Sequence, residues 1–341
     1  MMLFAVTQFR KHLILLIVGL VLLSMPACDG LRPEMHTQAP ILSKFEIQSR
    51  AHLSWSPDGT RLAFMQGNQP MEPAHLVVLD ISTGDLKNLG DKQWDYDSPD
   101  QWSPDGSQIV VARDGNLWIV RVANGTTTYL TKGEGAVWAP DGQMLAVFRG
   151  PHSGGPQDYF QITFVTPEGH ELHTISAGDI PPPKPTPMPR PTELGDHERR
   201  LIMGYSAPYF TGLAWSPDGQ SLVYSIVSPD EERGDLFIIN RDGSNLRRMP
   251  QAGFSTEPSW SPRGDRIAYV FASPYNIPGD LFLTTSRGEC HIRLTEGGGV
   301  YTPVWSPDGR KIALWALGDI YVLDVEKYLA DEYFDPKQCK Q

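Results

Sequence analysis

The pentapeptide Trp-Ser-Pro-Asp-Gly, intact or with one change, occurs six times in this chain of 341 residues. In each copy Pro presets φ for a turn, Asp tolerates the next position, and Gly adopts the left-handed geometry that returns the chain, so a tight hairpin turn is predicted. The Trp before the turn is large enough to fill space between stacked sheets. Six symmetric copies indicate a structural repeat rather than a catalytic site. The copies begin at Trp55, Trp102, Trp138, Trp215, Trp260 and Trp305.

The segments after each copy follow one pattern. A short β-rich run comes first, such as RLAFM at Arg61–Met65, and a second run, such as HLVVLD or DLFIIN, precedes another tight turn. Apolar and polar residues partly alternate in these runs, as they do in half-buried strands. Four short strands in a repeat of about 45 residues are typical of a β-propeller blade. The sequence therefore predicts an all-β fold, a six-bladed β-propeller of four-stranded antiparallel blades.

Six such repeats resemble the TolB-like propellers, whose WD40-like repeats share the Trp-Ser-Pro-Asp-Gly core. The resemblance covers roughly residues 42–325 and implies the fold. It does not imply one function, because similar repeats occur in propellers that gate peptidases and in propeller lyases that act on pectin fragments. TolB also has a separate domain before its propeller. The short segment after Cys28 leads us to expect no such domain here, so a role in a Tol-type complex is not implied.

The N-terminus resembles an export signal. The apolar run Leu13–Leu23 follows Arg10 and Lys11, and it is too short to cross a bilayer core of about 30 Å. Basic residues before a run of this length are typical of a signal peptide. We therefore expect residues 1–27 to be a signal peptide that is removed.

Cys28 ends the segment SMPAC, which resembles a bacterial lipobox, although Met25 and Pro26 differ from the residues usual there. The resemblance implies that Cys28 is lipidated and becomes the new N-terminus, with a linker over residues 28–40. We expect an extracytoplasmic protein anchored to a membrane, as a periplasmic or cell-surface lipoprotein. A freely secreted protein is the alternative.

The propeller is expected to occupy residues 41–325, followed by a C-terminal tail over residues 326–341. The last repeat offers only three strands, whereas Ile41–Gln48 supplies a spare strand before the first Trp. We predict that this N-terminal strand closes the ring as the outer strand of blade six.

The two rims of the predicted ring differ in the length of their connections. The Trp-Ser-Pro-Asp-Gly turns lie on one rim and are uniformly short, while the long connections lie on the other. The longest is a Pro-rich insert over residues 176–209, between blades three and four, whose PPPKPTPMPRP run favours extended polyproline II. Function is usually displayed on loops of a rigid scaffold, so the long-connection rim is the expected binding face.

Charge and cysteine content narrow the partners. The formal net charge is -11, without a Lys/Arg-rich block that a nucleic-acid surface would need. No nucleic-acid partner is expected, and we expect a monomer. Cys290 and Cys339 are a candidate disulfide, because an extracytoplasmic location permits one.

An acidic segment, DKQWDYDSPD, leads into the second blade. Its carboxylates make Asp95, Asp97 and Asp100 candidate ligands for Ca²⁺, but the glycine-bearing pattern of a calcium loop is missing. A solvated acidic loop is the favoured interpretation, so neither a metal site nor a cofactor is expected. His170 and His173, in GHELH, are interpreted as turn and strand residues.

Residues that lead into each innermost strand are expected at the mouth of the central channel, where aromatic and acidic groups could hold a peptide or a carbohydrate. No nucleophile elbow (GxSxG) and no HExxH motif is present, and no catalytic residue is proposed. The candidate ligand- or partner-binding residues are Tyr96, Asp97, Glu134, Tyr209, Glu257 and Tyr301.

The sequence thus favours a non-enzymatic scaffold that binds a protein or peptide partner in the cell envelope through the long-connection rim and the channel mouth. The alternative is a carbohydrate-active or other small-molecule enzyme at the channel mouth. That alternative would require His, Arg and carboxylate side chains to converge there.

Overall fold

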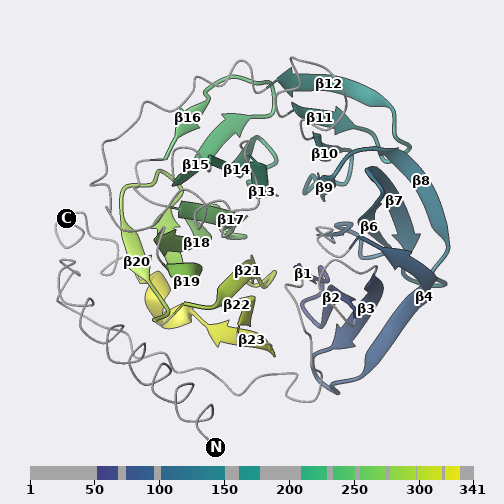
Figure 1. Cartoon of the computed structure of the whole chain (residues 1–341), viewed down its shortest axis with the longest axis horizontal. Coiled ribbons are helices and arrows are strands. Elements are labelled where there is room, and N and C mark those ends of the chain that lie inside the picture. Colours follow the sequence, from purple (N-terminus) through teal and green to yellow (C-terminus); the bar gives the residue numbers. More distant parts are fainter. Residues whose placement is uncertain are drawn as a thin grey trace, which may run out of the picture.

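A computed structural model shows an all-β propeller with antiparallel four-stranded blades around a central axis (Figure 1). A 3-10 helix, Glu326–Leu329, follows the last strand. The residues described are 52–67, 74–95, 101–149, 161–176, 209–228, 233–249, 254–273, 276–296, 298–316 and 319–330.

The first half of the ring consists of three separate four-stranded sheets. In each, the strands are neighbours in chain order, and the first strand lies nearest the axis (Figure 1). The first sheet contains β1 (Leu53–Trp55), β2 (Arg61–Gln66), β3 (Ala74–Asp80) and β4 (Leu86–Trp94); the second β5 (Gln101–Trp102), β6 (Gln108–Arg113), β7 (Asn116–Arg121) and β8 (Thr127–Lys132); the third β9 (Gly135–Trp138), β10 (Leu145–Arg149), β11 (Gln161–Val165) and β12 (Glu171–Ser176).

The second half is one eleven-stranded sheet. It contains three antiparallel groups, β13–β16, β17–β20 and β21–β23. The bounds are β13 (Tyr209–Trp215), β14 (Ser221–Ser228), β15 (Arg233–Asn240), β16 (Arg247–Arg248), β17 (Phe254–Trp260), β18 (Arg266–Ser273), β19 (Asn276–Thr285), β20 (His291–Arg293), β21 (Val300–Trp305), β22 (Lys311–Ala316) and β23 (Asp319–Asp324).

The hydrogen bonds therefore define four sheets, where the sequence led us to expect six separate ones. Two single residue pairs make the difference: Gly234 pairs with Phe254, and Gly279 pairs with Val300. A Cβ on Gly234 would lie 3.2 Å from the backbone oxygen of Ser255. Glycine thus lets the neighbouring strand approach closely enough to pair across the boundary.

The first and last groups of strands are in contact. The Trp55 indole donates a hydrogen bond to the Val304 carbonyl (3.2 Å), and Leu53 and Phe64 share a buried cluster with Ile320. The predicted closing strand Ile41–Gln48, Cys28 and the signal peptide lie outside the described residues. So does most of the Pro-rich insert.

The Trp-Ser-Pro-Asp-Gly turns have the predicted structure. In the first, Asp58 Oδ1 accepts from the Ser56 hydroxyl at 2.5 Å and from the Thr60 N–H at 3.0 Å. Gly59 has a φ of 70°, which is left-handed geometry. The serine-to-aspartate bond is repeated from Ser103 to Asp105, from Ser216 to Asp218 and from Ser306 to Asp308.

Successive turns touch one another through glycine and proline. A Cβ added to Gly106 would lie 3.6 Å from Cδ of Pro57 in the preceding turn. Because Gly59 meets Pro307 in the same way, the last turn lies against the first. The other contacts are Gly142 with Pro104, Gly219 with Pro140, Gly264 with Pro217 and Gly309 with Pro262.

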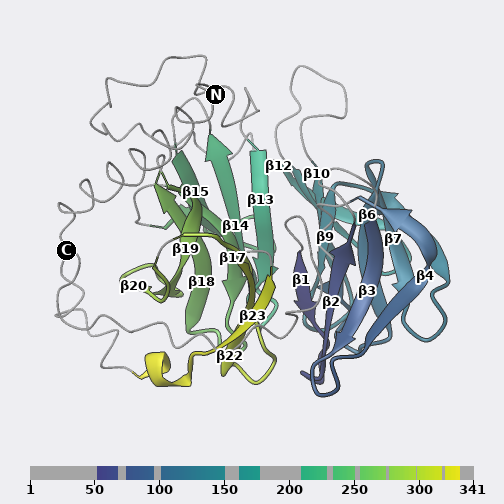
Figure 2. The same ribbon diagram turned by 60° about the horizontal axis from the view of Figure 1, so that its bottom comes forward.

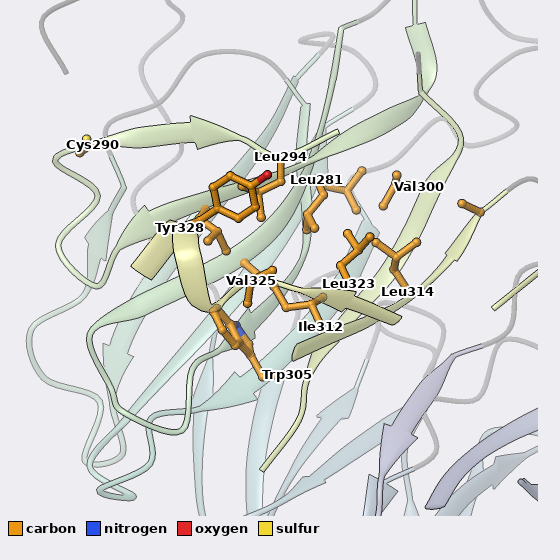
Figure 3. Close-up of a cluster of buried hydrophobic side chains, with 14 residues drawn as sticks. Leu281, Cys290, Leu294, Val300, Trp305, Ile312, Leu314, Leu323, Val325 and Tyr328 are labelled. Atoms are coloured by element: carbon orange, nitrogen blue, oxygen red, sulfur yellow. The ribbon is translucent and has the colours of Figure 1, made fainter. Parts of the chain in front are cut away.

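The repeated tryptophans pack between neighbouring groups of strands, as predicted. Trp305, which is 6% exposed, lies in a buried cluster with Leu323 and Val325 (Figure 3). Its indole nitrogen donates to the carbonyl of Ser259, the residue before Trp260. The same bond joins Trp55 to Val304 and Trp215 to Val137.

Candidate functional site

The structure describes part of the predicted channel mouth. Glu134, Glu257 and Tyr301 are described, and Tyr209 begins β13 with only its backbone described. Tyr96, Asp97, Asp100 and Cys339 lie outside the described residues. Glu257 and Tyr301 belong to strands β17 and β21 rather than to connections, because the innermost strands begin earlier than the sequence indicated.

Polar side chains next to the repeated tryptophans join neighbouring innermost strands. Ser54 Oγ accepts a hydrogen bond from the Trp102 N–H at 3.2 Å. In the same way the Gln101 side chain accepts from the Trp138 N–H, and Ser259 Oγ accepts from the Trp305 N–H at 3.4 Å. These residues therefore stabilise the ring.

One boundary between innermost strands is unusual, that between β17 and β21. Glu257 Oε2 accepts the Thr302 N–H at 2.5 Å. Both residues have positive φ, 53° for Glu257 and 47° for Thr302, and each lies at a register shift in its strand. Left-handed geometry is costly for non-glycine residues, and such strain is concentrated at ligand clamps and active sites. The two strained residues share one hydrogen bond, which makes this boundary the leading candidate site.

Two aromatic rings belong to the strand group that contains Thr302. Tyr301 precedes Thr302 and pairs across the sheet with Trp315, with ring centroids 5.4 Å apart. Trp315 is partly buried, and its indole nitrogen has no hydrogen-bond partner in the part of the chain that the structure describes. We call Glu257, Tyr301, Thr302 and Trp315 the acidic-aromatic seam.

The strand on the other side of Glu257 also approaches closely. A Cβ on Gly212 in β13 would lie 3.0 Å from Cα of Glu257 and 3.0 Å from Cδ of Pro258. Glu134 is not part of this arrangement: it is exposed and precedes β9, and β13 separates β9 from β17 around the ring. The structure thus places Glu257 on the strand next to that of Tyr301 and leaves Glu134 apart.

The seam contains a carboxylate on β17 and two aromatic rings on the next group of strands, β21–β23. Carboxylates form strong hydrogen bonds with ammonium and guanidinium groups. Aromatic faces also attract such cations, with about 0.5–2 kcal/mol for each contact. The chemistry therefore suits a Lys or Arg side chain of a peptide.

The repeated turn aspartates have a structural role. Hydrogen bonds from the Ser56 hydroxyl and then from Thr60 lower the pKa of Asp58 to about 2. The pKa values of Asp105, Asp218 and Asp308 are lowered in the same way, first by the serine hydroxyl of their own turn. In their ionised form, these carboxylates stabilise the turns.

The calcium candidate that is described, Asp95, also stabilises local structure. Its Oδ2 accepts the N–H of Asp114, which has a φ of 52° in the hairpin between β6 and β7. Within the described ranges no group of three or more His, Cys, Asp or Glu side chains is placed to hold a metal ion.

His173 and Cys290 have structural partners. His173 lies on β12, stacks on Phe164 with centroids 4.3 Å apart, and bonds the Arg241 carbonyl at 2.7 Å. Cys290 is buried and disulfide-bonded; its pairing with Cys339 stays a prediction. No helix in the described ranges is long and apolar enough to cross a bilayer.

Sequence reasoning missed several residues of this region. Thr302, Trp315 and Gly212 carry no motif. Two ion pairs of buried aspartates had a signal, because Gly-Asp recurs at the same relative position within β15 and β19. They join Asp235 to Arg248 at 2.6 Å and Asp280 to Arg293 at 2.7 Å.

Known proteins share this architecture. A family model described as the dipeptidyl peptidase IV (DPP IV) N-terminal region matches residues 71–138. A TolB from Agrobacterium tumefaciens is 18% identical, covers 81% of this chain and 91% of its own, and has a TM-score of 0.58.

Two further solved structures are similar. Hydrazine synthase from Kuenenia stuttgartiensis is 15% identical over 88% of this chain and 81% of its own, with a TM-score of 0.54. An oligogalacturonate lyase from Vibrio parahaemolyticus is 15% identical over 82% of this chain and 92% of its own, with a TM-score of 0.51. At these identities the similarity defines the fold, a TolB-like β-propeller.

Proposed function

We propose that this chain is a non-enzymatic binding propeller that holds a protein or peptide partner at the acidic-aromatic seam and the long-connection rim. The observation that carries the proposal is the bond between Glu257 and Thr302, two residues held in left-handed φ on neighbouring strands. A carboxylate held in this way suits a basic side chain of the partner.

The asymmetry of the rims supports the same function. The rim of the Trp-Ser-Pro-Asp-Gly turns is closely packed through its Gly–Pro contacts. The connections after β10 and after β12, residues 150–160 and 177–208, join strand ends at the opposite rim. Long connections on a rigid ring can vary in sequence without loss of the fold, so they suit recognition.

We further propose six blades, with the eleven-stranded sheet counted as three. In support, β15–β17 and β19–β21 are each joined by one residue pair, and six turns are in contact around the ring. The group β21–β23 has three strands. We propose Ile41–Gln48 as its outer strand and the ring's closure, within a propeller over residues 41–325.

We propose that the chain is exported, monomeric and anchored through a lipid on Cys28, as expected from residues 1–27 and the linker 28–40. Replacing the thiol by Cys28→Ala should then release the protein from membranes into the soluble envelope fraction. Retention of the variant in the membrane fraction would reject the anchor.

Peptide selection tests the binding function. The purified full-length chain is used to select from a random dodecapeptide library, and selected peptides should be enriched in Lys or Arg. Glu257→Gln preserves an acceptor for the Thr302 N–H but removes the charge, so it should weaken binding of the selected peptides about tenfold. Glu134→Gln removes the same charge from an exposed site elsewhere and is the matched control.

Two results would contradict this function: selection without enrichment of basic residues, or equal loss of affinity in both variants. The insert is tested separately by deletion of residues 181–200. Unchanged binding of selected peptides would exclude a role for the insert in recognition.

A carbohydrate-active enzyme is the second candidate, because one structural neighbour is named an oligogalacturonate lyase. Incubation of the chain with oligogalacturonate, followed by ultraviolet absorbance of unsaturated products, tests it directly. If the chain turned over this substrate and substitutions in the channel abolished the turnover, an enzymatic function would replace the proposed binding function.

A further inference from the structure

One repeat position differs between the second sheet and the groups β13–β16 and β17–β20. In the two later groups, an Arg on the outer strand lies opposite a Phe: Phe237 pairs with Arg248, and Phe282 pairs with Arg293. Each Arg binds the buried Asp two residues before that Phe.

In the second sheet the corresponding cross-strand pair is Trp118 and Tyr129. Asn116 takes the position of the Asp, and its side chain donates to the Asp114 carbonyl at 2.9 Å. The ion pair of the later groups is thus replaced by two aromatic rings. Tyr129 is 49% exposed, one of two large hydrophobic residues that are exposed in the described chain.

Aromatic neighbours support the Trp118 and Tyr129 rings. Trp94 of β4 is fully buried and lies 6.5 Å from Trp118 between ring centroids. The Tyr129 ring meets Trp118 edge to face, with centroids 5.6 Å apart. An exposed ring supported in this way forms a rigid platform rather than a mobile side chain.

A lysine from the neighbouring sheet is held beside the platform. Lys92 Nζ lies 5.2 Å from the Trp118 ring centroid and donates to Thr127 Oγ1 at 2.5 Å. Gly90 permits this approach, because its Cβ would lie 3.3 Å from the Gly125 carbonyl oxygen. Figure 1 shows β4 and β8 on the outer wall of the ring, and Figure 2 shows β4 there from another side. We call Lys92, Trp118, Thr127 and Tyr129 the outer-wall patch.

We propose that the outer-wall patch binds an acidic sugar unit of an oligosaccharide. The exposed Tyr129 ring can stack on the C–H face of a pyranose, while the oriented Lys92 ammonium binds its carboxylate. A second lysine, Lys132, pairs with Asn116, which lies two residues before Trp118 on β7; the register of β8 shifts between the two pairs. It can bind the next acidic unit.

Size and charge favour a sugar over other occupants. A stable protein interface buries roughly 800 Å² on each partner, far more than two rings and a lysine provide. Binding to an anionic membrane needs several clustered basic residues. The chain as a whole carries a net charge of -11, so an anionic ligand is favoured only where cations are held in place.

The test uses hyaluronan hexasaccharide, which carries carboxylates, and neutral maltohexaose, titrated into the full-length chain by calorimetry. We expect saturable binding of the hyaluronan probe with Kd near or below about 1 mM, and at least tenfold weaker binding of maltohexaose. Lys92→Met and Tyr129→Ala should each weaken hyaluronan binding at least tenfold. Lys87→Met removes the same charge from the other end of β4 and should change Kd less than twofold.

Several outcomes would overturn the proposal. They are no saturable binding at millimolar probe, equal loss of affinity in Lys92→Met and Lys87→Met, or Lys92-dependent binding of phosphatidylglycerol vesicles without binding of hexasaccharide. Unchanged melting temperatures would show that the variants are folded. Because the patch lies outside the acidic-aromatic seam, Glu257→Gln should leave hyaluronan binding unchanged whether or not the peptide-binding proposal holds.

Discussion

The two halves of the ring have the same kind of turn on one rim. At the other rim they differ in how neighbouring groups of strands are joined. Strands β1–β12 form three separate sheets, whereas β13–β23 form one sheet through the pairs of Gly234 and Gly279 with the next strand. A buried Asp follows each of these glycines and binds an Arg on the outer strand.

The comparison shows that one repeat can be adapted without disturbing its turn. In the second half, Asp280 also accepts from Thr295 Oγ1 and from the Gly298 N–H, so it fixes the connection to β21. In the second sheet of the first half the same position is Asn116, and the region holds the exposed Tyr129 ring instead. We therefore expect the second half to depend on single polar residues more strongly than the first.

The largest expected effect is at Asp280. Asp280→Ala would leave Arg293 without its carboxylate and would remove the acceptor of the buried Thr295 hydroxyl and of the partly buried Gly298 N–H. We expect a loss of about 3 kcal/mol in the free energy of unfolding, less than for a fully buried pair because Arg293 is partly exposed. Urea denaturation measures it. Asn116→Ala, the matched change in the first half, should cost less than about 1 kcal/mol; similar losses in both variants would remove the distinction between the halves.

The disulfide of Cys290 should stabilise the second half further. If Cys339 is its partner, Cys339→Ser should expose a reactive thiol at Cys290 and lower the free energy of unfolding by about 3 kcal/mol. Peptide mapping by mass spectrometry without reductant identifies the linked peptides. Detection of Cys290 joined to any other cysteine would reject this pairing.

A smaller effect is expected at Glu257, which separates the seam's structural role from its charge. Glu257→Ala removes the acceptor of the Thr302 N–H and should cost about 1–2 kcal/mol. Glu257→Gln retains an acceptor and should cost less than about 0.5 kcal/mol. Thermal unfolding of both variants measures the difference. Equal destabilisation would mean that the carboxylate charge, rather than the bond, holds the strands together.

The smallest effect concerns pH and the turns, which both halves share. The lowered pKa of Asp58 means that its ionised form stabilises the fold above its ordinary value of 3.8, and this contribution is lost as pH falls toward about 2. Because its side chain is 54% exposed, we expect only about 1 kcal/mol. Asp58→Asn should reduce the slope of stability between pH 4 and pH 2.

Asp141 provides the control for that change, because Ala139 replaces the serine that donates to the other turn aspartates. Asp141→Asn should alter the slope less than Asp58→Asn. Equal changes in slope would show that the serine hydroxyl contributes little.

The turns and the packing of the tryptophans could be predicted because both are encoded locally. Ser56, Asp58 and Gly59 contain the donor, the acceptor and the left-handed residue of one turn. The sequence also showed Trp55 in its repeated place. It did not show that its indole would bind Val304, because that partner comes from the other end of the ring.

The candidate site was less accessible to sequence reasoning. Glu257 was identified as a ring position, but its bond to Thr302 depends on register shifts in two strands, and no local pattern encodes them. Asp95 was a candidate cation ligand, and its actual donor, the Asp114 N–H, is provided by a hairpin of the next strands. The ion pair of Asp280 had a signal in the repeated Gly-Asp. Detecting that signal would have required alignment of the third strands of the repeats as well as of their turns.

The contact between Trp55 and Val304 spans 249 positions of sequence and does not rely on the covalent chain between them. It makes the boundary between the first and last strand groups resemble the other boundaries in its bonding. The position of the chain opening around the ring therefore does not determine how the ring is held together. A circular permutant opened between β16 and β17, with its former ends linked, should fold into the same propeller.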